Sequence, residues 1–296
     1  MDKEHIPALI ALNKLFLYST KPGNRIYEYL KNSGRNPEEF FSHPEEAFRA
    51  TNLEMPAEMN ISPALLEEAC KENEALTAQG IQFAGPDDFP RRYRQVPDSS
   101  LLLYMKTQSE PWMVLNQKMV AFAGTRDCSV HARHTVRHAI QKIAESDKKT
   151  CVIAGLSFGI ETEAHQAALD CGLTTVAVLP NGIDSVYPLS NRGLAEEIAS
   201  TPGCALITPF PPGKKPDAFN MLKRLTVIAS LSNKIILVES KTKGSVIVTA
   251  RLAYDYGDRK IFAFPGNLDD EKAKGCNRLI REGIAEIVTD YSDILL

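Results

Sequence analysis

Residues 118–126 have the sequence KMVAFAGTR, in which an apolar stretch runs directly into Gly124, Thr125 and Arg126. A helical pattern begins soon afterwards, near Ser129. A strand that leads through a glycine turn into a helix leaves backbone N–H groups at the helix N-terminus, where they favour an anion such as phosphate. Arg126 adds a fixed positive charge at the same point. Parallel α/β domains have many such turns, so an ordinary turn with a solvated arginine is the alternative.

The sequence after this stretch alternates between short apolar strands and helices at a spacing of about 25–30 residues. This pattern predicts βα units of an open parallel sheet. Ligands of such sheets bind at the C-terminal ends of the strands, where Gly124, Gly155, Gly159, Gly182 and Gly266 are expected. The predicted strands are residues 119–124, 150–155, 174–180, 204–208, 234–239, 260–266 and 285–289, and the helices between them are residues 129–146, 159–172, 191–200, 246–257 and 276–283.

The sequence before residue 80 shows only helical periodicity. Pro22-Gly23 is expected to end a first helix, and Asn24 to cap a second one. We predict a small all-α domain over residues 1–79, a connector over 80–112 and the α/β domain over 113–296. Further N-terminal helices are expected to begin at or just before Pro37, Pro44 and Pro63.

The connector is rich in proline but contains two short strand patterns, residues 81–83 and 101–105. Its segment 91–94, RRYR, combines three arginines with a tyrosine. This combination could form a basic and aromatic nucleic-acid surface, but so short a cluster favours a solvated loop.

The charge of the chain is unevenly distributed. Residues 1–80 hold 8 Lys+Arg and 13 Asp+Glu, whereas the remainder holds 26 and 24. This balance excludes a protein that coats duplex DNA by a strongly basic surface, so any nucleic-acid site must be local.

The six cysteines are scattered without a CxxC pair, which favours buried, reduced thiols and a cytoplasmic location. We expect no metal site, because no Cys/His pair has the spacing of metal ligands and His131 with His134 stands alone. The sequence has no signal-peptide pattern and no apolar run of the roughly 20 residues that a membrane span needs.

Five segments, in their order and spacing, resemble the DprA/Smf family of DNA-processing proteins. The resemblance covers residues 80–290 and implies an extended Rossmann-like domain with helices on both faces of its sheet. It implies that the helical N-terminus is a sterile-alpha-motif-like (SAM-like) domain, and that a C-terminal winged-helix domain found in some members is absent. The segments are AFAGTR (121–126), AGLSFGIETEAHQAAL (154–169), AVLPNGIDSVYPLSN (177–191), VIVTARLAYDYGDRKIFAFPGN (246–267) and GCNRLIREGIAEIV (275–288).

The function that the resemblance implies is binding of single-stranded DNA, with dimerisation and transfer of the DNA to the RecA recombinase in natural transformation. Gly124-Thr125-Arg126 matches the family's Gly-Ser-Arg turn, whose arginine contacts a DNA phosphate. Gly155–Gly159 would form a second loop that a sugar–phosphate backbone can approach closely. The expected DNA- and phosphate-binding residues are Gly124, Thr125, Arg126, Gly155, Leu156, Ser157, Phe158, Gly159, Asn191, Lys223, Arg224 and Lys243.

Several residues of these motifs also have purely structural interpretations. Glu161 and His165 are four residues apart on one helix and could form an acid/base pair, but a hydrogen bond that holds the loop is favoured. Asn191 can cap the helix that follows it. The motif residues Gly275 and Asn277 are expected to be structural.

The chain departs from the family pattern where charge would matter. Phe158 and Leu189 stand where the family usually has basic residues, and Leu225 and Thr226 replace part of an R-N-R run. Each lost cation removes a potential phosphate contact and flattens the salt dependence of binding. Phe158 could instead stack on a base, whereas we expect Leu189 to pack against the protein.

Three functional hypotheses remain open at this stage. The leading one is a DprA-like protein that protects incoming single-stranded DNA and assists RecA loading, without catalytic residues, cofactor or metal. The second is an enzyme that acts on a small phosphorylated nucleoside, with Glu161 as base or nucleophile and Arg126 as phosphate clamp. The third is an interaction protein that has kept the fold and lost DNA binding.

Overall fold

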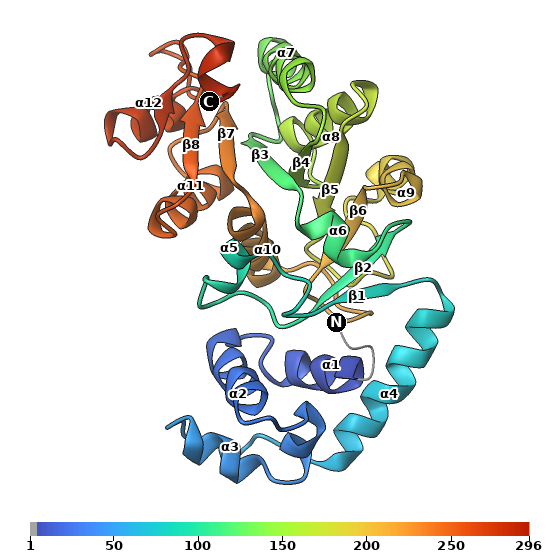
Figure 1. Cartoon of the computed structure of the whole chain (residues 1–296). Coiled ribbons are helices and arrows are strands. Elements are labelled where there is room, and N and C mark those ends of the chain that lie inside the picture. Colours follow the sequence, from blue (N-terminus) through green and yellow to red (C-terminus); the bar gives the residue numbers. More distant parts are fainter. Residues whose placement is uncertain (1–4, 296) are drawn as a thin grey trace.

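In the computed structural model, which describes residues 5–295, nine strands form one sheet in the order β1-β2-β6-β5-β4-β3-β7-β8-β9 (Figure 1). The strands from β3 to β9 are parallel, as the alternation of strands and helices predicts. The strands are β1 Gln82–Ala84, β2 Leu103–Thr107, β3 Lys118–Gly124, β4 Thr150–Gly155, β5 Thr174–Val178, β6 Ala205–Thr208, β7 Lys234–Val238, β8 Lys260–Ala263 and β9 Glu286–Ile287.

The strand order reverses at β3, which pairs with β4 on one side and with β7 on the other. The strands β4, β5 and β6 follow one another on one side of β3, and the strands β7, β8 and β9 follow one another on its other side. The loops that follow β3 and β7 therefore leave in opposite directions. In open α/β sheets this reversal marks the place where ligands bind.

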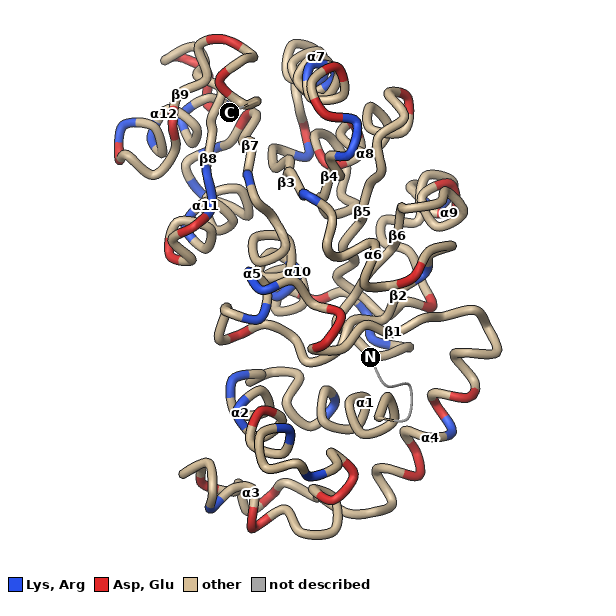
Figure 2. The backbone as a smooth tube through the Cα atoms, in the orientation of Figure 1, with Lys and Arg blue, Asp and Glu red and all other residues tan. Residues whose placement is uncertain are grey.

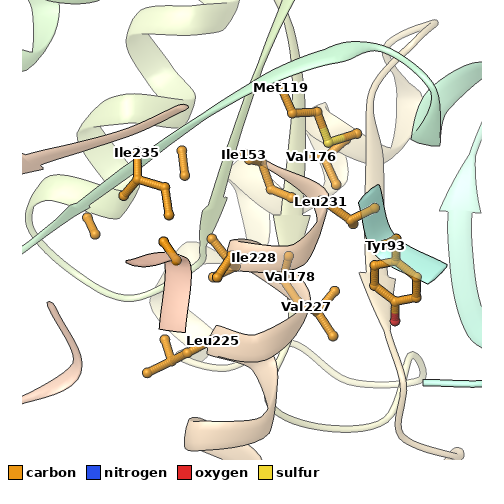
Figure 3. Close-up of a cluster of buried hydrophobic side chains, with 14 of the residues drawn as sticks. Tyr93, Met119, Ile153, Val176, Val178, Leu225, Val227, Ile228, Leu231 and Ile235 are labelled. Atoms are coloured by element: carbon orange, nitrogen blue, oxygen red, sulfur yellow. The ribbon is translucent and has the colours of Figure 1, made fainter. Parts of the chain in front are cut away.

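Helices cover both faces of the sheet, as predicted. Helix α10 buries Leu225 and Ile228 against Ile153 and Ile235 of the strands (Figure 3). On the other face, helices α7 and α8 pack on alternate strand residues that include Phe122. The helices and short helical turns of this part of the chain are α5 Arg91–Arg94, α6 Pro111–Leu115, α7 Val130–Ser146, α8 Ile160–Asp170, η3 Leu189–Asn191, α9 Arg192–Ser200, α10 Ala218–Leu231, α11 Ser245–Asp255, α12 Lys274–Arg281 and η4 Tyr291–Leu295.

The N-terminal region is helical, and in Figure 1 its helices lie together below the sheet, next to β1 and β2. The prediction that Pro22-Gly23 separates two helices is wrong, because α2 begins at Thr20 and runs through both residues. A proline is tolerated in the first helical turn, where its missing N–H has no partner to lose. Gly23 is needed because a Cβ there would lie 2.9 Å from Phe16 and Leu101. The elements are α1 Ile6–Leu15, α2 Thr20–Asn32, η2 Pro37–Phe41, α3 Pro44–Ala50 and α4 Pro63–Ala78.

The N-terminal region is held by hydrogen bonds to the loop that follows β6 and to α10. The Asn13 Nδ2 donates to the Pro209 carbonyl at 2.9 Å, and the Lys223 Nζ donates to Thr20 Oγ1 at 3.1 Å. One buried apolar cluster joins residues of α1, such as Leu9, to strand residues of the sheet. These contacts hold the helices beside the C-terminal ends of β5 and β6.

The segment 80–112 contributes two strands to the sheet. The strands β1 and β2 occupy the positions expected from residues 81–83 and 101–105 to within two residues, and β2 pairs antiparallel with β6. Residues 91–94 form one helical turn rather than an irregular loop, and Arg91 and Arg94 are exposed on it. Tyr93 is fully buried there, and Arg92 donates to the carbonyls of Leu231 and Gln117 at 2.6 and 2.9 Å.

All six cysteines are unpaired, and four of them are buried, whereas Cys70 and Cys171 are partly exposed. Within residues 5–295, no group of three or more His, Cys, Asp or Glu side chains is placed to hold a metal ion. None of the helices in the same range is long and apolar enough to cross a membrane.

Candidate functional site

The turn after β3 is held between β7 and α8. The Thr125 N–H donates to the Glu239 carbonyl at 3.0 Å, and the Thr125 carbonyl accepts from the Ile160 N–H at 3.3 Å. A side chain at Gly124 would overlap the Val238 carbonyl. These contacts fix the backbone at the point where the chain reaches Arg126.

The Arg126 side chain is exposed, and its Nη2 lies 3.9 Å from the Met221 Sδ on α10. Within the part of the chain that the structure describes, no carboxylate lies within 4.0 Å of its guanidinium nitrogens. The guanidinium therefore keeps its positive charge and its hydrogen-bond donors available to an external anion.

The N-terminus of α7 is already occupied by a carboxylate of the protein itself. Glu239, which follows β7, accepts from the Ser129 N–H at 2.9 Å and from the Ser129 hydroxyl. Its backbone has a φ of 51°, an uncommon conformation for a residue other than glycine. Because this carboxylate takes the Ser129 N–H and the Glu239 carbonyl takes the Thr125 N–H, the predicted phosphate cradle of free backbone groups does not exist at these two residues.

The loop Gly155–Gly159 is pinned by side chains from two helices and from the residue that precedes α9. The Ser157 N–H donates to Glu161 Oε2 at 2.8 Å, and the Leu156 carbonyl accepts from Asn191 Nδ2 at 2.9 Å. The two glycines approach the protein closely rather than leaving room for a ligand. A Cβ at Gly155 would lie 2.6 Å from Arg224, and one at Gly159 would overlap the backbone carbonyls of Thr125 and Arg126.

A buried ion pair lies beneath this loop. Arg224 is 2% exposed and Glu161 is 7% exposed, and the Arg224 Nη2 lies 3.4 Å from both carboxylate oxygens. The same Nη2 donates to the Ser157 hydroxyl at 3.0 Å, whereas the buried Nε and Nη1 have no hydrogen-bond partner. Arg224 therefore does not reach solvent, and in this conformation it is not the phosphate-binding cation that we predicted.

Glu161 and His165 have the structural roles that the sequence favoured. His165 is fully buried, with Nε2 2.7 Å from the Gly155 carbonyl and Nδ1 2.7 Å from Thr175 Oγ1. Burial lowers the pKa of His165 from 6.5 to about 4, which keeps the ring neutral at physiological pH. Neither side chain is exposed, so Glu161 and His165 do not form an acid/base pair that a substrate could reach.

Three further predicted site residues have different environments. Asn191 is buried and makes no capping hydrogen bond to α9, because its amide holds the loop after β4 instead. Lys223 donates to Thr20 of the N-terminal region and, at 2.7 Å, to the Asp98 carbonyl of the segment 80–112, and burial lowers its pKa to about 8. Lys243 is exposed in the loop before α11, and among residues 5–295 it forms no ion pair.

No local sequence pattern pointed to the cation that neutralises Asp127, the acid next to Arg126. Lys272 lies 2.9 Å from Asp127, and this hydrogen bond lowers the pKa of the Asp127 carboxyl. The two residues come together because the Ser240 N–H donates to the Lys272 carbonyl at 2.5 Å and the Gly275 N–H donates to the Ser240 carbonyl at 2.6 Å. Asp127 and Lys272 are far apart in the sequence and come into contact only in the folded protein, so no local pattern predicts this ion pair.

Comparison with known proteins identifies the family. Residues 81–296 match the family model for DNA recombination-mediator protein A. The chain belongs to this family. It is 32% identical over 209 residues to the DNA processing protein DprA of Streptococcus pneumoniae, with 71% of each protein covered, and 31% identical over 217 residues to protein Smf of Synechocystis, with 72% of this chain and 53% of that protein covered.

The similarity to solved family members extends to the N-terminal helices. The X-ray structure of the S. pneumoniae DprA matches 98% of this chain and 96% of its own, with a TM-score of 0.79 at 27% identity. A DprA of Helicobacter pylori, which binds single-stranded DNA, has the same fold over 72% of this chain and 94% of its own, with a TM-score of 0.63 at 21% identity. The Rossmann-like fold expected from the family resemblance is thus confirmed.

Two departures from the family pattern are on the surface. Phe158 is 49% exposed and Leu189 is 72% exposed, so the expectation that Leu189 packs against the protein is wrong. Tyr187, two residues before Leu189, is also exposed. The replacements Leu225 and Thr226 both lie on α10, where Leu225 is buried in the core and Thr226 is partly buried.

The structural roles expected of Gly275 and Asn277 are confirmed. Gly275 contacts the Ser240 backbone, and the Asn277 amide forms hydrogen bonds with both the N–H and the carbonyl of Gly266.

Proposed function

We propose that this chain binds single-stranded DNA at the C-terminal edge of its sheet, with Arg126 as the principal phosphate ligand. The observation that carries the proposal is the exposed Arg126 guanidinium, which extends from a turn fixed by β7 and α8 and has no carboxylate partner among residues 5–295. Lys243 supplies a second exposed cation on the loop that follows β7. Membership in a family of DNA-processing proteins supports DNA as the polyanion.

The uncharged residues around Arg126 favour a single strand over a duplex. Phe158, Tyr187 and Leu189 are exposed on the loops that follow β4 and β5. Unpaired bases present flat faces that stack on such side chains, at roughly 1–3 kcal/mol per base, whereas a duplex keeps these faces covered. The acidic N-terminal region contributes little to general DNA attraction, since Figure 2 shows Asp and Glu along α3 and α4.

The proposal includes the cellular role expected of a DprA-like protein. The chain would act in the cytoplasm as a homodimer, protect incoming single-stranded DNA and assist the loading of RecA. It would do so without catalysis or a cofactor, and the burial of Glu161 and His165 supports this part of the proposal. The division into residues 1–79, 80–112 and 113–296 is part of the same proposal.

The test is a salt series of single-stranded DNA binding, measured by fluorescence anisotropy with a labelled oligo(dT). Arg126→Ala should weaken binding at about 50 mM salt and reduce the slope of log K against log salt by about 0.7, the value for one lost phosphate contact. Leu189→Lys should act in the opposite direction, because it places a cation at an exposed position of the same edge.

The matched control is Arg49→Ala. Arg49 is also exposed, but it lies on α3, on the side of the N-terminal region away from the sheet (Figure 1). If Arg126→Ala binds as tightly as Arg49→Ala at every salt concentration, Arg126 is not the phosphate ligand. Stabilisation by a mononucleotide but not by oligo(dT) in a thermal-shift assay would favour an enzyme instead.

A further inference from the structure

Two exposed aromatic rings meet where the N-terminal region contacts α10. Tyr18, between α1 and α2, is 60% exposed, and Phe219, in the first turn of α10, is 40% exposed. Their ring centroids are 5.0 Å apart at an interplanar angle of 57°. The fold leaves this pair largely in contact with water, although it buries other large aromatic side chains such as Tyr93 and Phe122.

The start of α10 contacts both Arg126 and the aromatic pair. Met221, two residues after Phe219 and therefore on another side of the helix, lies 3.9 Å from the Arg126 Nη2. Leu222, three residues after Phe219 and on the same side as Phe219, is 52% exposed. Phe219 and Leu222 thus form an apolar surface on the first two turns of α10 that ends at Tyr18, one helical turn or less from the Arg126 contact.

Cations lie at the far end of this surface as well. The Lys214 Nζ is 5.1 Å from the centre of the Tyr18 ring and donates to its hydroxyl. Lys215 and Lys21 are exposed, and within residues 5–295 neither forms an ion pair. Two acids lie in this group. Asp217 accepts from the Asn220 N–H at 2.7 Å as the cap of α10 and lies 3.8 Å from Lys214, and Asp184 accepts from the Gly213 N–H at 2.9 Å.

The position of Tyr18 is set by contacts on both sides. The Asn13 amide donates to the Pro209 carbonyl, and Lys223 donates to Thr20 Oγ1 two residues beyond Tyr18. The N-terminal region therefore presents Tyr18 to α10 as part of a fixed surface rather than from a free chain end.

We propose that Tyr18 and Phe219 form a base-stacking step that extends the DNA site from Arg126 onto the N-terminal helical region. Aromatic side chains placed between cations are typical of surfaces that bind single-stranded nucleic acid without sequence preference. Bases would stack on the two rings, and Lys214 and Lys215 would contact the phosphates that follow. This inference rests on the proposed function and adds a role for the N-terminal region in holding the strand.

The test compares Tyr18→Ala and Phe219→Ala with Tyr254→Ala, a control at another exposed tyrosine, on α11. With an oligo(dT) of about 15 nucleotides, each of the first two variants should lose about 5- to 150-fold in affinity, the equivalent of about 1–3 kcal/mol, with little change in salt slope. Tyr254→Ala should match the wild type. All three residues are exposed, so the fold should tolerate the substitutions.

A spectroscopic measurement distinguishes stacking from an indirect effect. Trp112 is the only tryptophan of the chain and lies on α6. In the double variant Trp112→Phe/Tyr18→Trp, oligo(dT) should quench the emission of the introduced tryptophan.

Failure of this inference and failure of the proposed function give different results. If Arg126→Ala weakens binding but Tyr18→Ala and Phe219→Ala behave like Tyr254→Ala, the aromatic extension is wrong and the Arg126 site stands. Unchanged emission in the double variant, despite tight binding, would also overturn the extension. If the wild type binds no oligo(dT) at about 50 mM salt, both proposals fail.

Discussion

Loss of the negative charge of Glu161, which pairs with the buried Arg224, should strongly lower the free energy of unfolding of the protein. The two side chains are 3% and 9% exposed, and within residues 5–295 Glu161 is the acid that pairs with Arg224. Glu161→Gln keeps the size of the side chain and an acceptor for the Ser157 N–H, but it leaves the guanidinium buried without a counter-charge. Removing one partner of a buried pair typically costs about 3–5 kcal/mol.

This cost can be measured by urea unfolding, followed by circular dichroism at pH 7. With about 2–4 °C per kcal/mol for a chain of this size, Glu161→Gln should also lower the Tm by roughly 6–20 °C. Arg224→Met should destabilise by a similar amount because it leaves the carboxylate unpaired. The double variant should recover at least about 2 kcal/mol relative to the sum of the two single variants, since neither charge then remains.

Glu196→Gln is the matched control. Glu196 also pairs with an arginine, Arg192, but the two side chains are 64% and 68% exposed. Its loss should cost about 0.3–0.5 kcal/mol, the usual value for an exposed pair one helical turn apart. If Glu161→Gln costs no more than this control and the double variant is additive, the ion pair does not hold the loop after β4, and our explanation of its geometry is refuted.

Two further predictions concern the same framework. Gly159→Ala should destabilise the protein more than Gly172→Ala, and it should also weaken DNA binding. Both glycines have a positive φ, but only at Gly159 would a Cβ overlap the Thr125 carbonyl. Equal unfolding midpoints of the two variants would contradict this prediction. The pKa of His165 is about 4 in the folded protein and 6.5 in the unfolded chain, so between pH 4 and pH 6.5 the unfolded state binds more protons than the folded state. The free energy of unfolding should therefore fall by up to about 3 kcal/mol as the pH drops from 6.5 to 4. A His165→Gln variant should lose this component of the pH dependence, which a comparison of urea midpoints at pH 7 and pH 5 would show.

The sequence is sufficient to predict the parallel part of the sheet because each strand there is an apolar run followed by a glycine or a turn. The glycines Gly124 and Gly155 indeed end β3 and β4 at the same edge. The pairing of β2 with β6 was not predictable in the same way, because an antiparallel strand of five residues carries no helix to mark its direction. The start of α2 was missed because proline in a first turn does not break a helix.

The candidate site was predictable in position but only partly in its working residues. From the sequence, Arg126 and Arg224 are equivalent positive charges. Only their burial in the folded protein shows that Arg126 can contact a ligand and that Arg224 cannot. The partner that buries Arg224 is Glu161, 63 residues away, and the carboxylate at the α7 N-terminus comes from Glu239, 110 residues from Ser129. Pairings over such distances depend on the strand order, which local patterns do not reveal.

Internal carboxylates take backbone N–H groups at two of the places where a phosphate could have bound. Glu239 takes the Ser129 N–H at the α7 N-terminus, and Glu161 takes the Ser157 N–H in the loop after β4. We therefore expect side-chain cations, chiefly Arg126, to supply much of the phosphate binding, and this part of the affinity should fall with salt. Contacts of bases with Phe158 and with the apolar start of α10 release no counterions, so they contribute a salt-independent part. The family resemblance implies basic residues at the positions of Phe158 and Leu189, so we expect this chain to keep a larger share of its affinity at high salt than a relative with those basic residues.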